Sequence, residues 1–445
     1  MKYDTSTKAI PYINYAKQTR NKVLWLYNQH RNINVVKDDI KKVVLILSAS
    51  RSGSSLLYDV LKQSDQLMSL EGETTPFYKL HQCCFPFNEL QSDILDTKNS
   101  YCTDQLDNIF NDILYDIGIG GQLPNFKPDG YFFYLVRRLA LQWPQIGLSI
   151  DQWIHYINAS YHHFTKEHNR WNTDLFYISL IKKIQCDYPD INVCYYDLSD
   201  ERTLNIKSNN FSNAPPNDTF CIEEPPFVMA QPRKRPDLKA MKTLPLILKS
   251  TVDLYRISFI KQLFPSAEFQ YLVLTRNPAA SINGLYRGWL HRGFFSHNLK
   301  NKATLKIAGY SDCFKWGNHW WNFDLPPGWK KTIQSPLEYV CGFQWYSANK
   351  YIIENTQKES QTNIMRIKFE DFIQSSKERY YIVKNIANFI GIDCNNHMKK
   401  YVNVLPVVMA TDSPSNVRWK QMKDKIEPVI NQKDINYLSR YLGYS

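Results

Sequence analysis

The chain contains 445 residues, 43% of them hydrophobic, which can bury an ample core in one large or two ordinary domains. Its 54 basic and 42 acidic residues give a formal net charge of +12, which favours a polyanionic ligand, although nucleic acid or an anionic membrane surface would also fit. Because no run of five or more basic residues occurs, we expect a nucleotide ligand and no nucleic-acid partner.

Nine cysteines are scattered without a CxxC pair, so neither a disulfide framework nor a zinc site is predicted, and we expect no metal. The N-terminal region has no apolar signal core, and no stretch approaches the roughly 20 apolar residues that a membrane helix needs. The sequence therefore predicts a cytoplasmic protein without a membrane span.

The N-terminal part predicts a helical lead-in at residues 1–40, followed by an apolar strand at residues 43–47. The loop after this strand reads SASRSGSS, and a helix follows it. Such an order makes an anion cradle, because unpaired N–H groups and the helix dipole face the ligand. Gly53 lets the backbone approach an anion, and Arg51 supplies the charge. An ordinary strand-to-helix turn is the alternative interpretation.

The middle of the chain, residues 83–244, predicts a large and mostly helical insertion. Helix-compatible apolar spacing runs through residues 130–188. Residues 200–236 are rich in Pro, Asn and Ser, which indicates a long loop or flap.

Further apolar strands are predicted at residues 246–249, 269–274 and 364–369, separated by helices. Together with the first strand they predict an α/β fold, a P-loop-NTPase-like parallel sheet flanked by helices. Ligands bind at the carboxyl ends of such strands, where Lys249 and Arg276 lie.

Two segments carry a resemblance to a known family. The loop at residues 48–57 resembles the 5′-phosphosulfate-binding loop of sulfotransferases that use 3′-phosphoadenosine 5′-phosphosulfate (PAPS). The strand and Arg-Asn-Pro turn at residues 269–281 are similar to the 3′-phosphate-binding segment of that family. The resemblance covers residues 41–82 and 245–445, so residues 83–244 are left to bind the acceptor or to act as a lid.

The resemblance implies transfer of a sulfuryl group from PAPS, as co-substrate, to a hydroxyl acceptor by in-line displacement. Glu73 lies where the family's tyrosylprotein branch has the glutamate that acts as general base, so the resemblance implies this role for Glu73. Lys249 and Arg51 are the other implied catalytic residues. The implied nucleotide-binding residues are Arg51, Ser52, Gly53, Ser54, Ser55, Arg276, Ser281, Asn283, Trp419 and Lys420.

Other residues remain as alternatives for the chemistry. Glu71 is the reserve base, and both carboxylates could instead be first-turn helix residues favoured by the helix dipole. Weaker candidates are the bases His291 and His297 and a serine near the transferred group, either Ser413 or Ser415. The aromatic and basic residues of segment 286–295 could line the acceptor cleft.

Two other functions compete with a sulfotransferase: a P-loop-type kinase and a non-catalytic anion-binding protein. A kinase would require a Gly-Lys-Ser/Thr loop ending, which the chain lacks. A simple binder would have no use for Glu73. The acceptor itself stays open among carbohydrates, lipids, small metabolites, phenols and peptide tyrosine, and the oligomeric state is not predicted.

Overall fold

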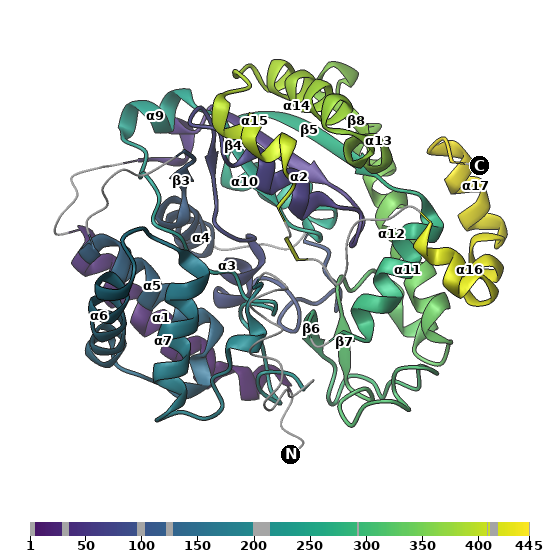
Figure 1. Ribbon diagram of the computed structural model, residues 1–445. Helices are drawn as coiled ribbons and strands as arrows, with labels where there is room; N and C mark the ends of the chain where they lie inside the picture. Colours follow the sequence, from purple (N-terminus) through teal and green to yellow (C-terminus); the bar gives the residue numbers. More distant parts are fainter. Residues whose placement is uncertain are drawn as a thin grey trace.

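The computed structural model describes residues 5–28, 35–95, 103–121, 128–198, 214–291, 293–406, 408–409 and 417–444. Its centre is a six-stranded sheet in the order β3-β2-β4-β1-β5-β8 (Figure 1). The strands are β1 (Lys42–Leu47), β2 (Met68–Ser69), β3 (Gly118–Ile119), β4 (Leu246–Lys249), β5 (Glu268–Thr275) and β8 (Ile364–Lys368). The predicted α/β fold is thereby confirmed.

One edge of the sheet departs from the predicted parallel arrangement. β3 pairs antiparallel with β2, whereas the other neighbouring strands pair in parallel. On its outer side, β3 is covered because the Ile119 N–H donates to the Lys234 carbonyl over 2.9 Å. The sheet is therefore mixed at this edge.

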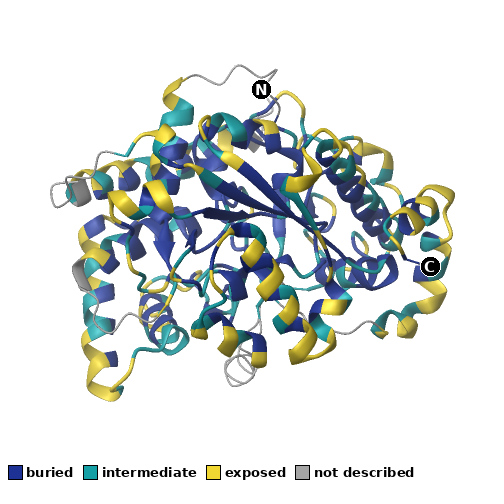
Figure 2. Ribbon diagram, turned by 90° about the horizontal axis from the view of Figure 1, so that it is seen from above, coloured by how far each residue is buried: buried dark blue, intermediate teal, exposed yellow. Residues whose placement is uncertain are grey.

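The central strand β1 explains why the sheet has two covered faces. Val43, Leu45 and Leu47 belong to one core cluster, whereas Val44 and Ile46 belong to the cluster on the opposite face. A continuous apolar run in a strand indicates that both faces of the sheet are buried, because successive side chains point to opposite faces. Seen from above, the strands are buried and the exposed residues lie on the outer helices (Figure 2).

Helices cover both faces of the sheet. One face carries α2 (Ser54–Leu61), α13 (Phe369–Gln374), α14 (Ser376–Ile390) and α15 (Asn396–Asn403). The main core cluster includes residues of α3 (Thr75–Leu80), α4 (Thr103–Asp116), α9 (Leu238–Thr243), α10 (Ile257–Leu263), α11 (Pro278–Trp289), α12 (Leu337–Thr356), α16 (Lys423–Ile430) and α17 (Lys433–Tyr441). A hairpin of β6 (Phe295–Asn298) and β7 (Trp320–Asn322) follows α11.

A second group of helices has a core of its own beside the sheet (Figure 1). Its members are α1 (Thr5–Asn28), α5 (Pro128–Gln142), α6 (Ile150–Glu167) and α7 (Thr173–Gln185). Tyr15 of α1 donates to the Leu148 carbonyl and accepts from the indole of Trp153. The N-terminal helix α1 therefore packs with this group of helices as well as preceding the first strand.

Short 3-10 helices complete the described chain: η1 (Lys37–Asp39), η2 (Pro144–Ile146), η3 (Val193–Tyr195), η4 (Asp253–Tyr255), η5 (Trp329–Thr332), η6 (Gln361–Asn363) and η7 (Arg418–Met422). Within the described ranges, no helix is both long and apolar enough to cross a bilayer.

Candidate functional site

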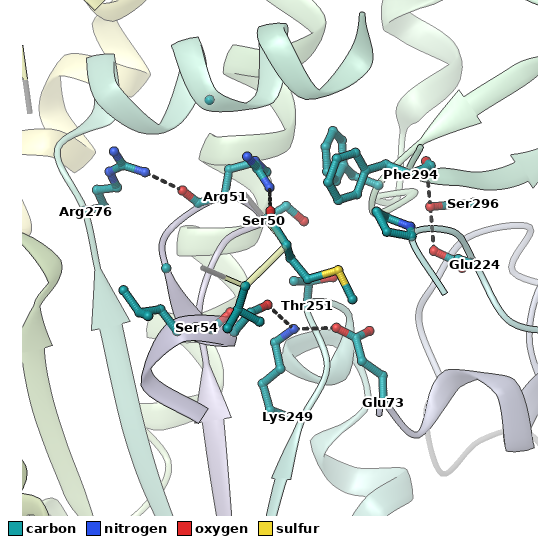
Figure 3. A pocket seen from close by; sticks show the side chains of 18 of the residues that line it. Ser50, Arg51, Ser54, Glu73, Glu224, Lys249, Thr251, Arg276, Phe294 and Ser296 are labelled. Atoms are coloured by element: carbon teal, nitrogen blue, oxygen red, sulfur yellow. Dashed lines mark hydrogen bonds and ion pairs between the residues drawn. The ribbon is translucent and has the colours of Figure 1, made fainter. Parts of the chain in front are cut away.

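A cavity of about 310 Å³ opens where β1, β4 and β5 end (Figure 3). Its walls come from the loop before α2, the start of α3, the loop at residues 223–228, the α11 face, the start of β6 and residues 405–409. Five cationic side chains line it, namely Arg51, Lys249, Arg276, Arg287 and Arg418, against the carboxylates of Glu73, Glu223 and Glu224. The cavity thus lies where the sequence predicts a ligand.

The loop between β1 and α2 forms the floor of the cavity. Arg51 and Gly53 both have left-handed backbones, with φ of 65° and 94°. A Cβ on Gly53 would lie 2.1 Å from Cε2 of Phe369, so only glycine fits there. Ser54 begins α2, whose first N–H groups have no intrahelical partner and therefore suit an anion.

The loop serines differ in position. Ser54 and Ser55 line the cavity, and the Ser55 hydroxyl accepts a hydrogen bond of 2.9 Å from Lys249 Nζ. Ser52 is buried and does not line the cavity, whereas Ser50 does. The Ser50 hydroxyl donates to the buried carboxylate of Asp324 over 2.9 Å.

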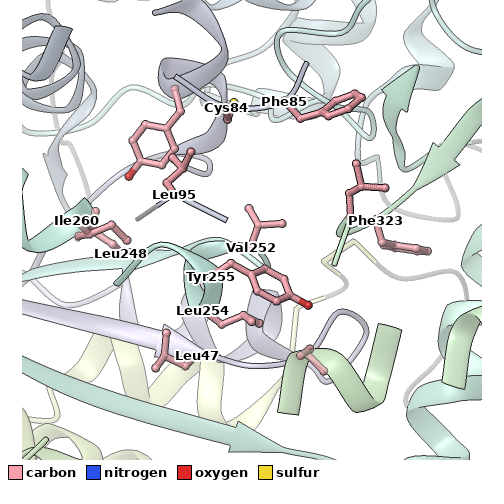
Figure 4. Packing of buried hydrophobic residues seen from close by; sticks show 14 of the residues in the cluster. Leu47, Cys84, Phe85, Leu95, Leu248, Val252, Leu254, Tyr255, Ile260 and Phe323 are labelled. Carbon is pink, nitrogen blue, oxygen red and sulfur yellow. The ribbon is translucent and has the colours of Figure 1, made fainter. Parts of the chain in front are cut away.

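Asp324 lies beneath this loop in an apolar setting. Tyr255 donates to its second carboxylate oxygen over 3.0 Å, and the Tyr255 ring packs near Leu47, Val252 and Leu254 (Figure 4). Burial raises the pKa of Asp324 from 3.8 to about 7. The loop is therefore supported from below by a carboxyl group that titrates near neutrality.

Arg51 and Arg276 come together above the loop. Arg276 Nη1 donates to the Arg51 carbonyl over 2.9 Å, and Arg51 Nη1 donates to the Met409 carbonyl over 2.6 Å. Burial, with the positive charge of Arg276 in addition, lowers the pKa of Arg51 to about 10. Burial also lowers the pKa of Arg276, and Arg418 contributes to that shift. A bound anion would relieve both effects, which fits these residues to a phosphate ligand.

The turn after Arg276 is held by contacts distant in sequence. The Asn277 N–H donates to Glu370 Oε1 over 2.8 Å, and Tyr444 near the C-terminus donates to Glu370 Oε2 over 3.0 Å. The Asn277 side chain caps α11 by accepting from the Ala280 N–H over 3.2 Å.

The two residues of α11 that were predicted to bind the 3′-phosphate together with Arg276 lie on different sides of the helix. Asn283 lines the cavity, and its buried Oδ1 has no hydrogen-bond partner among the described residues. Ser281 is fully buried and does not line it. Ala280, Gly284 and Arg287 share the face with Asn283, at helical spacing.

The C-terminal candidates lie differently from what the sequence predicts. Trp419 and Lys420 belong to η7 and do not line the cavity; Trp419 packs against the main core and Lys420 is exposed. Arg418, which sequence reasoning missed, lines the cavity instead. The sequence could have indicated Arg418, because it precedes Trp419 and Lys420 in the same Arg-Trp-Lys segment. Ser413 and Ser415 lie outside the described residues.

Glu73 meets Lys249 at the cavity. Lys249 Nζ lies 2.5 Å from Glu73 Oε1, and the Ser250 hydroxyl donates to Oε2 over 2.8 Å. The Glu73 side chain is 34% exposed, whereas that of Lys249 is only 7% exposed. A carboxylate and an ammonium are thus held together beside the anion-binding loop.

A chain of hydrogen bonds behind Glu73 has a fixed direction. Arg256 can only donate, and its Nη1 bonds to Thr75 Oγ1 over 3.0 Å. The Thr75 hydroxyl proton is then free for Ser250 Oγ, 3.1 Å away, and Ser250 donates to Glu73. Arg256 itself is fully buried and paired with Asp93 over 2.8 Å. The chain orients Glu73 and delivers a proton donor to its carboxylate.

The other candidate bases do not line the cavity. Glu71 is buried 3.2 Å from Lys62, and its N–H donates to Asp116. His297 is buried against Asp93, with 3.1 Å between Nε2 and Oδ2. His291 lies beside the ring of Phe294. Of segment 286–295, Arg287 and Phe294 line the cavity.

Within the described ranges, no three His, Cys, Asp or Glu side chains are grouped so that they could hold a metal ion.

The sheet order, the loop after β1 and the cavity define an α/β protein with a cationic cavity at the carboxyl ends of its central strands. No family model and no curated protein matches the chain. Among solved structures, it is similar to the sulfotransferase domain from the Synechococcus PCC 7002 olefin synthase, with 13% identity, a TM-score of 0.38, and coverage of 93% of this chain and 99% of that one.

Two other solved structures are similar at the same level. The sulfotransferase domain from the curacin biosynthetic pathway has 14% identity and a TM-score of 0.37, and covers 91% of this chain and 98% of its own. The sulfotransferase from Alicyclobacillus acidocaldarius has 10% identity and a TM-score of 0.32, and covers 91% of this chain and 97% of its own.

Proposed function

We propose that this protein is a sulfotransferase that moves a sulfuryl group from PAPS to a hydroxyl acceptor. The observation that carries the proposal is one cavity in which Arg51 and Arg276 accompany the Glu73–Lys249 pair. The cations suit a polyanionic donor, and the carboxylate suits the activation of a hydroxyl group.

The charges of the residues that line the cavity suit PAPS, which carries several negative charges. The 3′-phosphate would be held by residues just before α11, on its cavity face and at the start of η7. These residues are Arg276, Asn283, Arg287 and Arg418. The N-terminus of α2 would hold the 5′-phosphate, directly after the left-handed turn at Gly53. When bound, PAPS supplies the sulfuryl group and its leaving phosphate.

Two side chains would then perform the chemistry. Glu73 accepts the proton of the acceptor hydroxyl as that oxygen forms its bond to sulfur. The bond from sulfur to the bridging oxygen breaks, and the leaving phosphate keeps the electron pair. Lys249, already bonded to Ser55 of the loop, neutralises the charge that develops there. Because the protein itself forms no covalent bond, positioning and electrostatics account for the catalysis.

Thermal unfolding separates this proposal from the kinase and the simple binder. We expect the desulfated product, 3′-phosphoadenosine 5′-phosphate, to raise the unfolding temperature, because a ligand that binds only the folded state stabilises it. ATP with Mg²⁺ serves as the matched comparison. Stabilisation by ATP alone would favour a kinase, and stabilisation by neither would exclude this nucleotide site.

Transfer itself requires radiolabelled PAPS and pools of hydroxyl acceptors. Label should appear in an acceptor only with the folded protein. Tight binding of the desulfated nucleotide without any transfer would favour a non-catalytic binder.

A further inference from the structure

We propose that the part of the cavity beyond Glu73 is an acceptor subsite for uncharged or cationic molecules with an apolar skeleton. It would recognise a second hydrogen-bond donor on the acceptor through Glu224 and reject anionic acceptors. The inference rests on the proposed function, because Glu73 would act on the hydroxyl group that reacts.

Glu224 is held as a hydrogen-bond acceptor facing the cavity. Its Oε1 lies 2.8 Å from Lys79 Nζ, and its Oε2 accepts from the Ser296 hydroxyl over 2.6 Å (Figure 3). Lys79 is 1% exposed and also donates to the Cys221 and Ser296 carbonyls, so all three of its N–H groups are used. The Glu224 side chain keeps 30% of its surface exposed. Its remaining lone pairs are therefore available to a ligand and fixed in place.

Apolar walls stand beside this carboxylate. The rings of Phe294 and Phe323 stack with centroids 4.7 Å apart, and both residues line the cavity. Both also have left-handed backbones, with φ of 67° and 62°, which costs energy for a bulky residue. Gly288 makes room for this arrangement, because a Cβ there would lie 2.4 Å from Phe323 Cζ. The wall is thus apolar and suited to a ring or hydrocarbon chain.

The charges on this side exclude a negative acceptor. Glu223 also lines the cavity, and its oxygens accept from Arg138, Gln142 and the Val228 N–H. Arg138 and Lys79 are buried and do not line the cavity, whereas Glu224 lines it with 30% of its side chain exposed. A carboxylate, sulfate or phosphate on the acceptor would approach Glu224, whose partner Lys79 is already used by the protein, and this is unfavourable. Arg51, which lies over the Phe294 ring with 5.0 Å from Cζ to the ring centroid, belongs to the donor phosphate in the proposed function. An ammonium or hydroxyl group would find an acceptor already positioned.

Four phenols that differ only in their remote group test this specificity: tyramine, tyrosol, 4-ethylphenol and 4-hydroxyphenylacetate. Binding is measured by calorimetry in the presence of 3′-phosphoadenosine 5′-phosphate, and a second set one methylene longer covers a longer reach. We expect tyramine and tyrosol to bind about tenfold more tightly than 4-ethylphenol, and the anionic phenol to bind most weakly. Equal binding of the anionic phenol and tyramine would overturn the proposal.

Variants assign the effect to Glu224. Glu224→Gln should abolish the advantage of tyramine over 4-ethylphenol, whereas Glu354→Gln, in an exposed Lys–Glu pair on α12, should leave the order unchanged. If the glutamine variant does not fold, Glu224→Asp keeps a carboxylate for Lys79 but withdraws it from the cavity by one methylene, and it should also remove the advantage of tyramine. An unchanged order in the foldable variants would refute the role of Glu224.

The binding order is independent of turnover. If the phenols bind in the expected order but no sulfuryl transfer occurs, the subsite stands and the proposed function fails. If transfer occurs to anionic acceptors as readily as to tyramine, the proposed function stands and the subsite fails.

Discussion

At the scale of single residues, Glu73 and Glu71 show that the direction in which a side chain points decides whether it can take part in catalysis. They are two positions apart, yet Glu73 reaches Lys249 at the cavity and Glu71 is buried beside Lys62. The sequence offers both as bases and prefers Glu73 through the family resemblance. Only the fold shows which carboxylate lies beside the loop of Arg51.

Removing the carboxylate charge of Glu73 should slow catalysis strongly and spare nucleotide binding. For Glu73→Gln we expect turnover to fall by roughly 10²–10⁴-fold, the usual contribution of a general base. Affinity for 3′-phosphoadenosine 5′-phosphate should stay the same or increase, since a negative charge leaves the cavity. Initial rates and calorimetry measure the two effects, and unimpaired turnover would remove Glu73 from the base role.

The hydroxyl of Thr75 should act through Glu73. In Thr75→Val the shape is kept, but Arg256 loses an acceptor and Ser250 loses a donor. We expect kcat to fall about tenfold with an unchanged KM for PAPS, and the free energy of unfolding to fall by about 1–3 kcal/mol. Thr75→Ser keeps the hydroxyl group and should restore kcat. A serine variant as slow as the valine one would show that packing, and not the hydrogen-bond chain, matters.

The turn from β5 into α11 is the most informative single element. Its strand, its Arg-Asn-Pro turn and the helix after it are all visible in the sequence, and the positions of Ala280, Asn283 and Arg287 follow from helical spacing. Glu224 and Arg418 could not be predicted in this way. They reach the cavity from loops distant in sequence, where no periodic pattern fixes a direction.

Arg276 should contribute to nucleotide affinity through its geometry as well as its charge. Arg276→Ala should weaken binding of 3′-phosphoadenosine 5′-phosphate by about 2–5 kcal/mol, as for a lost partner in a buried charge pair. Arg276→Lys keeps the charge but not the planar fork, and should lie between wild type and alanine. Arg366→Ala, at an exposed position of β8, is the control. Calorimetry that gives the same affinity for all four proteins would contradict a 3′-phosphate role.

At the scale of the whole molecule, the sheet was predictable because β1, β4 and β5 are apolar on both faces. The two-residue strands β2 and β3 were not, since so few residues carry no pattern. The packing of α1 with α5 was also not predictable, because the sequence shows which face of a helix is apolar and not what covers it.

Buried carboxyl groups should make stability depend on pH. Burial raises the pKa of Asp324 and of Asp253 from 3.8 to about 7. At a pH between 3.8 and about 7, the folded protein retains protons on these carboxyl groups that the unfolded chain has lost. The free energy of unfolding therefore falls as the pH rises, by up to about 1.4 kcal/mol per pH unit for each proton. We expect the unfolding temperature to decrease from pH 5 to pH 7.

Asp324→Asn should reduce this decrease, whereas Asp190→Asn, at an exposed position, should not. Unfolding followed by circular dichroism across this pH range measures the slope. A variant with the wild-type slope would show that Asp324 is ionised throughout.

The contact of Tyr444 with Glu370 links the far end of the chain to the turn that carries Arg276. Ending the chain after Leu442 would remove no described atom that lines the cavity, yet it would leave Glu370 free to rotate away from the Asn277 N–H. Calorimetry on the shortened protein should therefore show weaker nucleotide binding. Any fusion or substitution that displaces the Tyr444 side chain would accordingly change ligand affinity without touching the ligand.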